Sequence, residues 1–506
     1  MAAVAREIDR KYDLPAGRTA ALDAVQAVAG RAGVAAVSQQ GEQLLDAVYY
    51  DTADLRLISA GVTLQRRTGG EEAAWYLDLP AGADTRDEIR LPLAAPGGAV
   101  PEELAALARA YTRGAALAPV VCIQTSRRVL RLLDGSGQTL AETAADHMSA
   151  RPADGSAVVS WDEMEAELVT GGPALLTAIE ARLRQAGAQP AATVTKPQRA
   201  LAGRLPAAAP AAASPLTRSS PAGEMVLGYV RDQVAAIRRY DPLVRRDAPD
   251  AVHQMRVATR RARSALQAFG TIIDREATRP LCAELKWLAA ALGAARDGEV
   301  MLARLTADLA AIPPALVAGP VQDRITAHFT AELAPAGTAA LAALDGQRYL
   351  RLLEDLDALL ADPPLTPLAS RKAGKALAKP VRRSARRLRR ALAAVPAAGD
   401  RDAAIHEARK AAKRARYAAE AAAPALGRRA SRQAAQVKEL QQLLGDHHDS
   451  VVARAVLLDL AAKARAAGED TFTYGLMHQR QACQAAAMEQ ALPRLAPARG
   501  DRATGH

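Results

Sequence analysis

The spacing of apolar and polar residues divides the chain into two parts with different periodicities. In residues 1–200, short runs alternate apolar and polar side chains at every second position, which predicts β-strands. The expected strands cover residues 6–14, 47–50, 62–67, 74–79, 87–93, 121–133 and 160–168. Residues 18–30, 101–113 and 173–186 have the spacing of helices. The first part is therefore predicted to be an α+β domain.

The second part has helical periodicity throughout, and strand signals disappear. Proline clusters at residues 313–314, 363–364, 396 and 424 are expected to separate its helices. A Pro/Ala/Ser-rich stretch without apolar periodicity lies between the two parts and predicts a linker. The expected organisation is a domain over 1–205, a linker over 206–223, a helical domain over 224–492 with repeats at about 224–345 and 370–490, and a disordered tail over 493–506.

A duplicated motif marks the helical part. The run His253-x-x-Arg256-x-x-x-Arg260-Arg261-x-Arg263 recurs 153 residues later as His406-x-x-Arg409-x-x-x-Lys413-Arg414-x-Arg416. Each copy is followed by a second shared segment, Leu285-Lys286…Gly293…Asp297 in the first and Val437-Lys438…Gly445…Asp449 in the second. A repeated unit with cations at fixed spacing predicts two pseudo-symmetric basic surfaces. Such surfaces favour a polyanion as partner.

Charge separates the two parts as clearly as periodicity does. The chain has a net charge of +11, but residues 1–200 hold 20 basic and 25 acidic residues, whereas the remainder holds 46 and 30. The basic field therefore belongs to the helical part. Aromatic residues make up 3% of the chain, which is few for a protein that stacks on nucleobases.

Three features indicate a cytoplasmic protein. The cysteines Cys122, Cys282 and Cys483 are odd in number and far apart, so neither a disulfide framework nor a zinc knuckle is expected. The first residues carry charges where a secretory signal needs an apolar stretch. The sequence contains no charge-free run of about 18 apolar residues, so a membrane span is not expected. The Ala and Arg bias is typical of high-GC bacteria.

Charged residues alternate along several of the predicted strands. Glu7, Asp9 and Lys11 share one strand face, as do the three carboxylates at positions 163, 165 and 167. Cations share faces in the same way at Arg86 and Arg90 and at Arg127 and Arg131. Closed into a barrel, these strands would enclose a charged interior suited to a divalent metal and a polyphosphate. The alternative is that these are the solvated faces of an ordinary antiparallel sheet.

Residues 4–203 resemble the CYTH domain, the family of triphosphate tunnel metalloenzymes. Glu7-x-Asp9-x-Lys11 resembles the E-x-E-x-K motif of that family, and further motifs follow in its order: Tyr49-Tyr50-Asp51-Thr52, Gly61-Val-Thr-Leu64, Trp75-x-Leu-x-Leu-Pro80, Arg86-x-Glu88-x-Arg90 and Lys196-x-x-Arg199. The resemblance implies an eight-stranded antiparallel barrel that hydrolyses tripolyphosphate or a nucleoside triphosphate with Mg²⁺ or Mn²⁺.

The resemblance also assigns roles to residues. It implies a catalytic group of Glu7, Asp9 and Lys11, metal ligands at Glu7, Asp9, Glu163, Glu165 and Glu167, and phosphate-binding cations at Lys11, Arg67, Arg90, Arg127, Arg131, Lys196 and Arg199. Three positions depart from the family pattern. Asp9 is shorter than the usual Glu, Gln65 stands where Arg is usual, and Asp78 stands where Lys is usual. A barrel without catalytic activity is therefore the alternative reading.

Helical stripes of cations characterise the second part. His253, Arg256, Arg260 and Arg263 fall on one stripe, and residues 406, 409, 413 and 416 repeat it. A third stripe consists of Lys372, Lys375, Lys379, Arg382, Arg386 and Arg390. Like charges at this spacing destabilise a helix unless an anion compensates them. The alternatives are a solvated face for the stripes and ordinary core positions for the histidines. The first copy has Ala295-Arg296 at the positions equivalent to His447-His448, so a metal site at these histidines is not expected.

Residues 224–490 resemble the CHAD domain, named for its conserved histidines and helical fold. The resemblance implies two pseudo-symmetric helical bundles that bind inorganic polyphosphate. The implied contacts are His253, Arg256, Arg260, Arg263, Lys286, His406, Arg409, Lys413, Arg416 and Lys438. The expected function is polyphosphate binding coupled to a triphosphatase-like barrel, with association with polyphosphate granules as a further expectation. A purely binding protein and, less favoured, a nucleic-acid-binding protein are the alternatives. Specific nucleic-acid recognition and membrane binding are not expected.

Overall fold

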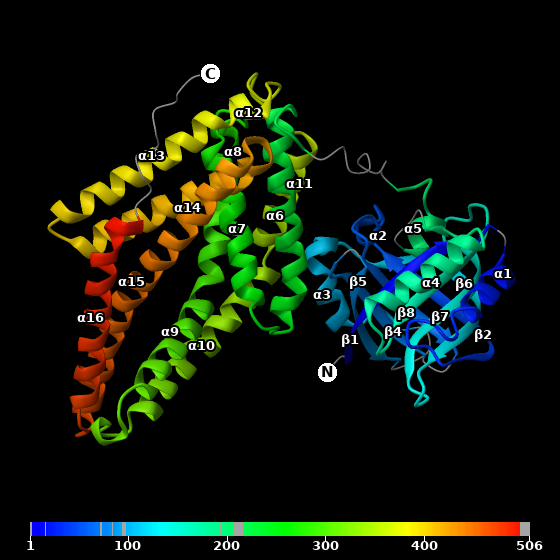
Figure 1. Cartoon of the computed structure of the whole chain (residues 1–506), viewed down its shortest axis with the longest axis horizontal. Helices are drawn as coiled ribbons and strands as arrows, with labels where there is room; N and C mark the ends of the chain where they lie inside the picture. Colours follow the sequence, from blue (N-terminus) through cyan, green and yellow to red (C-terminus); the bar gives the residue numbers. More distant parts are fainter. Residues whose placement is uncertain are drawn as a thin grey trace. The chain divides into compact units, whose positions relative to one another are not determined.

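The computed structural model describes residues 3–15, 17–70, 73–82, 84–93, 98–191, 195–205 and 216–495. The chain forms two compact units, residues 1–211 and 212–506 (Figure 1). The first unit contains the strands and the second is helical. The predicted linker lies mostly outside the described residues, as does the predicted tail beyond residue 495.

The first unit is a closed antiparallel barrel. Its strands are β1 (Ala3–Asp13), β2 (Ala36–Asp51), β3 (Thr63–Gly69), β4 (Ala74–Pro80), β5 (Thr85–Pro92), β6 (Ala118–Leu133), β7 (Thr139–Pro152), β8 (Val159–Leu168) and the short β9 (Gln189–Pro190). Strands β1 to β8 follow the order β5-β4-β3-β2-β6-β7-β8-β1, and pairing of β5 with β1 closes the ring. The predicted eight-stranded barrel is confirmed.

Strand β7 was not among the predicted strands. Its buried residues on the face toward the helices are small, namely Ala141, Thr143 and Ala145, so bulky apolar side chains do not alternate along it. It is a strand because β6 and β8 pair with it along most of its length. Strand propensity depends on such neighbours more than on the residues themselves. Strand β2 is longer than predicted for a similar reason, since its first half is mostly polar.

Two helices determine which face of β8 points into the barrel. Helices α1 (Arg18–Gln26) and α4 (Pro173–Gln185) pack their apolar residues, such as Val25 and Ile179, against Met164 and Ala166. Because side chains alternate along a strand, the odd-numbered carboxylates of β8 face the interior. The remaining helices of this unit are α2 (Arg56–Ser59), α3 (Glu102–Thr112) and α5 (Lys196–Ala200).

The second unit is all-helical in its described residues apart from turns and two isolated bridges. Its α-helices are α6 (Ala222–Arg245), α7 (Ala251–Ala268), α8 (Arg275–Ala291), α9 (Gly293–Ala310), α10 (Val321–Asp345), α11 (Gln347–Ala361), α12 (Ala373–Ala376), α13 (Ala378–Ala394), α14 (Arg401–Leu426), α15 (Arg428–Ala466) and α16 (Phe472–Leu495). None of the described helices is long and apolar enough to span a bilayer.

Proline positions mark three of the four predicted helix boundaries. The clusters at 313–314, 363–364 and 396 fall between helices, but Pro424 lies inside the last turn of α14. That helix ends two residues later, at Leu426, and the following Gly427 has a φ of 66°, which suits a residue without a side chain. The predicted start of the helical domain is also slightly late, because α6 begins at Ala222.

The two sequence repeats occupy corresponding helices. The first histidine–arginine motif lies on α7 and the second on α14, and the Leu-Lys…Gly…Asp segments lie on α8–α9 and on α15. Helices α9 and α10 share an apolar core with α15 and α16, containing Leu305, Phe329, Leu457 and Met477. The long helices of the two repeats therefore pack against each other (Figure 1).

Candidate phosphate-binding sites in the barrel and the helical unit

The barrel interior contains a carboxylate–cation network centred on β7 and β8. Asp146, which is 0% exposed, accepts two hydrogen bonds from Arg127, at 2.9 and 2.7 Å, and lies 2.9 Å from Lys196 Nζ. Burial opposes ionisation of Asp146, but the two cations hold its pKa below the ordinary value. Glu165 lies 3.1 Å from Lys11 Nζ, and despite burial its pKa is lowered by Lys11, Lys196 and Arg127.

Three carboxylates of this network form a candidate metal centre. Oxygen atoms of Asp146, Glu163 and Glu165 lie within 4.8 Å of one another. Glu163 accepts a hydrogen bond from Trp161 Nε1 at 3.0 Å through Oε2, while its buried Oε1 accepts no hydrogen bond among the described residues and lies 3.9 Å from Lys196 Nζ. A carboxylate oxygen without a hydrogen bond, beside two other carboxylates, is suited to a hard divalent cation. The predicted ligands Glu163 and Glu165 are thus brought together, with Asp146 as a third member.

A second group of carboxylates, contributed by β1, β4, β5 and β8, lies beside this network. Its members are Glu7, Asp9, Asp78, Glu88 and Glu167. Burial and then repulsion from Glu165 raise the pKa of Asp9 to about 7. The pKa of Glu88 and that of Glu167 each rise to about 8, first through burial and then through neighbouring carboxylates. This group of five carboxylates carries more negative charge than the neighbouring cations balance. Protonation or a bound metal ion would reduce the repulsion between the carboxylates.

The phosphate-binding cations predicted for the barrel fall into three sets. Lys11, Arg127 and Lys196 meet at Asp146 and Glu165, and a cavity of about 250 Å³ reaches Lys11, Asp9 and Arg86. Arg67 and Arg90 lie over the ring of Tyr76, at 3.9 and 5.8 Å from its centre.

Arg131 and Arg199 belong to a different environment. Arg131 pairs with Glu142 at 2.8 Å, and Arg199 pairs with Asp13 and lies over the Trp161 ring. The structure therefore joins these two cations to carboxylates other than those of the central network.

Of the three positions that depart from the family pattern, Asp9 belongs to the acidic group above, and Asp78 and Gln65 also face the interior. Asp78 accepts a hydrogen bond from Thr63 Oγ1 at 2.6 Å, and its other oxygen is buried without a partner among the described residues. Asp78 also raises the pKa of both Glu7 and Glu88. Gln65 is buried and supplies no charge. Sequence reasoning missed Asp146 because β7 was not recognised, and it did not include Arg86, which donates to Asp9 at 2.6 Å.

In the helical unit, cations from the two repeats converge. Burial and then repulsion from Arg409, Arg260 and Arg256 lower the pKa of Lys413 to about 7. Burial also lowers the pKa of Arg260; Tyr417 opposes this shift, and repulsion from Arg256 and Arg409 adds to it. We call Arg256, Arg260, Arg409 and Lys413 the α7–α14 cluster. Its nearest balancing carboxylate is that of Asp297, which pairs with Arg256 at 2.9 Å.

Histidines of both repeats border the α7–α14 cluster and are held neutral. His406 Nδ1 lies 3.4 Å from His448 Nδ1, and burial followed by the Arg409 charge lowers the pKa of His448 to about 4. Burial likewise lowers the pKa of His406 and that of His253, where Arg260 and Arg256 also contribute. These rings can exchange hydrogen bonds with a ligand but carry little positive charge near neutral pH.

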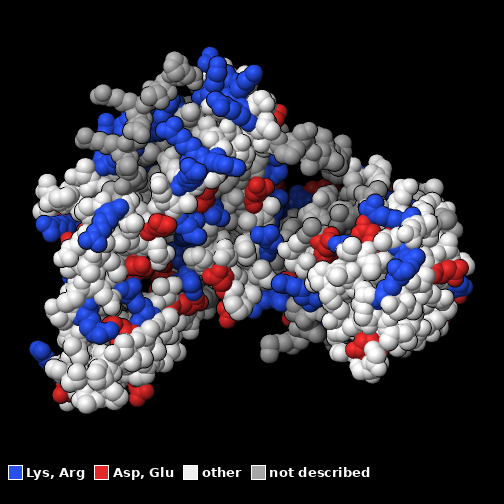
Figure 2. Space-filling view, viewed as in Figure 1, with Lys and Arg blue, Asp and Glu red and all other residues white. Residues whose placement is uncertain are grey.

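Other predicted contacts lie outside the cluster. Arg416 pairs with Glu420 at 2.7 Å, and Arg263 lies with Cys282 and Arg414. Lys286 and Lys438 are exposed on α8 and α15. The third stripe is exposed on α12 and α13, where Lys and Arg gather in Figure 2. Among the described residues, no ion pair satisfies its six cations, Lys372, Lys375, Lys379, Arg382, Arg386 and Arg390.

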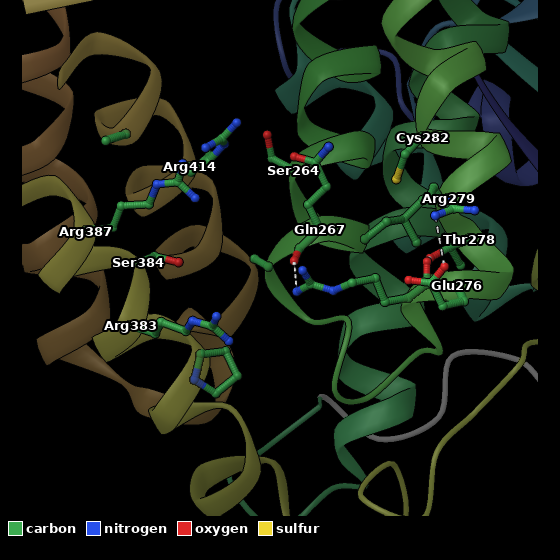
Figure 3. Close-up of a pocket in the computed structure, with 15 residues that line it drawn as sticks. Ser264, Gln267, Glu276, Thr278, Arg279, Cys282, Arg383, Ser384, Arg387 and Arg414 are labelled. Carbon is green, nitrogen blue, oxygen red and sulfur yellow. Dashed lines mark hydrogen bonds and ion pairs between the residues drawn. The ribbon is translucent and has the colours of Figure 1, made fainter. Parts of the chain in front are cut away.

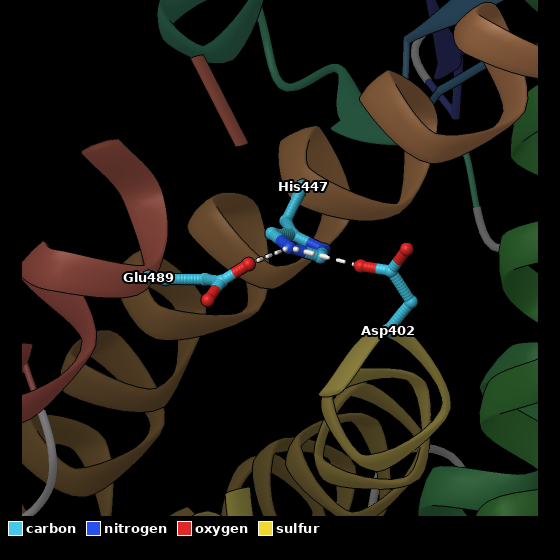
Figure 4. A group of neighbouring side chains, drawn as sticks. All are labelled: Asp402, His447 and Glu489. Atoms are coloured by element: carbon cyan, nitrogen blue, oxygen red, sulfur yellow. Dashed lines mark hydrogen bonds and ion pairs between the residues drawn. The ribbon is translucent and has the colours of Figure 1, made fainter. Parts of the chain in front are cut away.

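A histidine–carboxylate group links α14, α15 and α16. His447 is 1% exposed, and its Nε2 lies 3.2 Å from Glu489 and 3.6 Å from Asp402 (Figure 4). The three ligand atoms lie close enough to hold a metal. However, Arg454 and Arg401 pair with the outer oxygens of the two carboxylates, at 3.0 and 3.6 Å. The charges are thereby balanced, and the group joins three helices as an ion-pair network.

Comparison with known proteins identifies the helical unit directly. The model of the CHAD domain matches residues 228–458. Uncharacterized proteins from two strains of Mycobacterium tuberculosis, CDC 1551 / Oshkosh and H37Rv, are each 39% identical to this chain over 492 residues, covering 94% of it and 93% of the relative.

Solved structures resemble each unit separately. PptA from Streptomyces chartreusis is 24% identical and covers 55% of this chain and 99% of its own, with a TM-score of 0.48. The CHAD domain of the plant Ricinus communis is 27% identical and covers 57% and 96%, with a TM-score of 0.47. A proposed adenylyl cyclase of Hippeastrum, described as having a dominant triphosphatase activity, is 16% identical and covers 40% and 99%, with a TM-score of 0.27.

Proposed function

Because this chain belongs to the proteins in which a CYTH-type barrel precedes a CHAD domain, we propose that its helical unit binds inorganic polyphosphate at the α7–α14 cluster. The observation that carries the proposal is the mutual repulsion of Arg256, Arg260, Arg409 and Lys413, which come from both repeats. Four cations held together in a half-buried position destabilise the free protein. A linear polyanion would remove that repulsion along its length.

The side chains of the cluster suit phosphate rather than a single carboxylate. Arginine forks donate two parallel hydrogen bonds to phosphate oxygens, and a lysine contributes a compact charge between them. His253 and His406 lie on the same helices, beside the cations, and as neutral rings they can donate to further oxygens. The pseudo-symmetric arrangement presents similar groups twice, as a repeating ligand requires.

We further propose that the barrel binds the triphosphate group of tripolyphosphate or a nucleotide and hydrolyses it slowly. A Mg²⁺ or Mn²⁺ ion held by Asp146, Glu163 and Glu165 would supply positive charge for the phosphate oxygens. Lys11, Arg127 and Lys196, which now pair with these carboxylates, would bind phosphate oxygens in their place. Asp9 and Glu167, with raised pKa values, are the candidate proton acceptors.

A binding protein with an inactive barrel is the second candidate. The observation that favours it is Asp78, a half-buried carboxylate that makes no ion pair among the described residues, in the half of the barrel that already holds Glu7 and Glu88. Its negative charge repels phosphate. Release of phosphate from tripolyphosphate, with Mg²⁺ or Mn²⁺ and a metal-free control, decides between the two candidates.

The α7–α14 cluster is tested by competition at about physiological salt. Labelled polyphosphate is bound to the full chain and challenged with duplex DNA, and the order is then reversed. We expect polyphosphate to displace DNA, since a basic surface binds DNA non-specifically and weakly under these conditions. Displacement of polyphosphate by DNA at equal phosphate concentration would instead favour a nucleic-acid-binding protein.

A further inference from the structure

The helical unit has a second basic site, separate from the α7–α14 cluster. A pocket of about 400 Å³ opens between α7–α8 on one side and α13–α14 on the other (Figure 3). Five arginines and one glutamate are among its lining residues, the arginines being Arg275, Arg279, Arg383, Arg387 and Arg414. Its volume is within the range of small-ligand pockets, roughly 300 to 1,000 Å³.

The cations of this pocket are poorly compensated. Glu276 pairs with Arg279 at 3.2 Å, and both side chains are largely exposed at the edge. Among the described residues, no ion pair involves Arg383, Arg387 or Arg414, and the neighbouring Arg263 has a buried Nε without a hydrogen-bond partner. Burial and then repulsion from Arg387 and Arg263 lower the pKa of Arg414. The lining guanidinium groups without an ion pair or hydrogen bond among the described residues therefore come from α13 and α14, and they face Arg275, which donates to Gln267 O at 3.2 Å, and Arg279 on α8.

The remaining lining residues define the ligand class. Ser264, Gln267, Thr278 and Ser384 supply hydrogen-bonding groups around the arginines. None of the described lining residues is aromatic, so nothing stacks on a nucleobase. Arginine forks with hydroxyl and amide donors suit phosphate oxygens. We propose that this pocket is a second phosphate site, independent of the α7–α14 cluster, that binds a short condensed phosphate such as pyrophosphate or tripolyphosphate.

Cys282 provides a reporter inside the pocket. It is half-buried, lines the pocket and lies beside Arg263, whereas Cys483 is exposed on α16 and Cys122 belongs to the barrel. The full chain is treated with N-ethylmaleimide, and the modification of each cysteine is followed by mass spectrometry. Pyrophosphate at ten times its Kd should slow modification of Cys282 about tenfold by simple occupancy, and leave Cys483 unchanged. Calorimetric titration with pyrophosphate measures the same site without the thiol.

Matched variants separate this site from the one proposed above. Arg387→Ala with Arg414→Ala should abolish protection of Cys282 and the corresponding calorimetric binding, because it removes two unpaired pocket cations. Arg386→Ala with Arg390→Ala, on the exposed face of the same helix, should retain both. Arg409→Ala with Lys413→Met should also retain pyrophosphate protection, while losing long-chain polyphosphate if the α7–α14 cluster binds it.

Three results would overturn the inference. The first is that neither pyrophosphate nor tripolyphosphate protects Cys282 or binds in a way that depends on Arg387 and Arg414. The second is equal protection by sulfate at matched ionic strength, which would show a salt effect. The third is protection by long polyphosphate alone that disappears in the Arg409→Ala, Lys413→Met variant, which would make the pocket an extension of the α7–α14 cluster.

Discussion

At the scale of single residues, Asp78 has the largest consequence for the barrel. The family pattern has a lysine at this position. The carboxylate of Asp78 instead adds to the repulsion already present around Glu7 and Glu88. One oxygen of Asp78 accepts a hydrogen bond from Thr63, the other is buried without a hydrogen bond among the described residues, and the charge of Asp78 acts on Arg86 without a direct ion pair. Its position therefore limits how well a triphosphate can bind.

Replacing this carboxylate should improve catalysis. Asp78→Lys is expected to raise kcat/KM for tripolyphosphate by roughly a hundredfold, the lower end of the effect of one preorganised electrostatic group on a transition state. The change in kcat/KM is measured from the rate of phosphate release from tripolyphosphate with Mg²⁺ or Mn²⁺. Asp78→Asn is the matched control and should give an intermediate gain, since it removes the repulsion without adding a cation. Unchanged activity in Asp78→Lys would argue that the barrel is not a triphosphatase.

Lys413 makes the helical site sensitive to pH. Its pKa is lowered from 10.5 to about 7 in the free protein, so the unfolded chain binds more protons between these values. The stability of the free protein should therefore rise as the pH increases from 7 to 10.5. Lys413→Met should flatten this rise, which thermal unfolding at several pH values will measure.

Polyphosphate binding should reverse the shift of the Lys413 pKa. Phosphate oxygens stabilise the ammonium form, so binding at pH 8 is expected to take up protons from the buffer. Calorimetric titration in two buffers of different ionisation enthalpy measures that uptake. Lys413→Arg keeps the charge permanently and should abolish the uptake while preserving affinity. Equal uptake in this variant would place the titrating group elsewhere.

At the scale of elements, strand β7 shows which strands the sequence alone can predict and which it cannot. The strands with bulky alternating side chains were predicted, because those side chains themselves carry the signal. Strand β7 carries alanines where others carry larger residues, so Asp146 could not be assigned to the interior without its neighbours. Pairing with β6 and β8 depends on residues far away in the sequence.

Helical periodicity has a comparable limit in the second unit. The periodicity predicts that Arg256 and Arg263 lie on the same face of α7. It does not predict which other helices pack beside each turn of that face. In the structure Arg256 lies with Lys413 of the second repeat in the α7–α14 cluster, whereas Arg263 lies beside Cys282 of α8 and Arg414 of α14, outside that cluster. The convergence of the two repeats was predicted because the duplication itself implies pseudo-symmetry.

Helix α13 carries exposed cations that should assist binding from a distance. Its apolar side, including Val381 and Leu388, is buried, so changes on its exposed face should not unfold it. Arg382→Glu with Arg386→Glu is expected to weaken polyphosphate binding about tenfold at low salt, an effect that decreases as salt screens the charges. Arg428→Glu with Arg465→Glu, at exposed positions of α15, is the control. No difference between the two variants at any salt concentration would exclude this role.

At the scale of the whole molecule, the two units have opposite charge and separate cores. The described helical part, residues 216–495, should bind polyphosphate with the affinity of the full chain to within about threefold, since its cations come from that unit alone. Residues 3–205 should bind long chains weakly. A filter-binding assay on the two fragments and the full chain measures this. Loss of affinity in a folded 216–495 fragment would mean that the barrel contributes to the site.

The central claim is that cations from both repeats form one polyphosphate site, and charge reversal tests it most directly. The dissociation constant for long-chain polyphosphate is measured at about physiological salt for the full chain and for Arg256→Glu with Arg409→Glu, with circular dichroism as the check on folding. Loss of two charge-assisted contacts predicts an affinity more than about a hundredfold weaker, with unchanged helicity. An affinity within about threefold of the natural chain, in a variant that remains folded, would contradict the account.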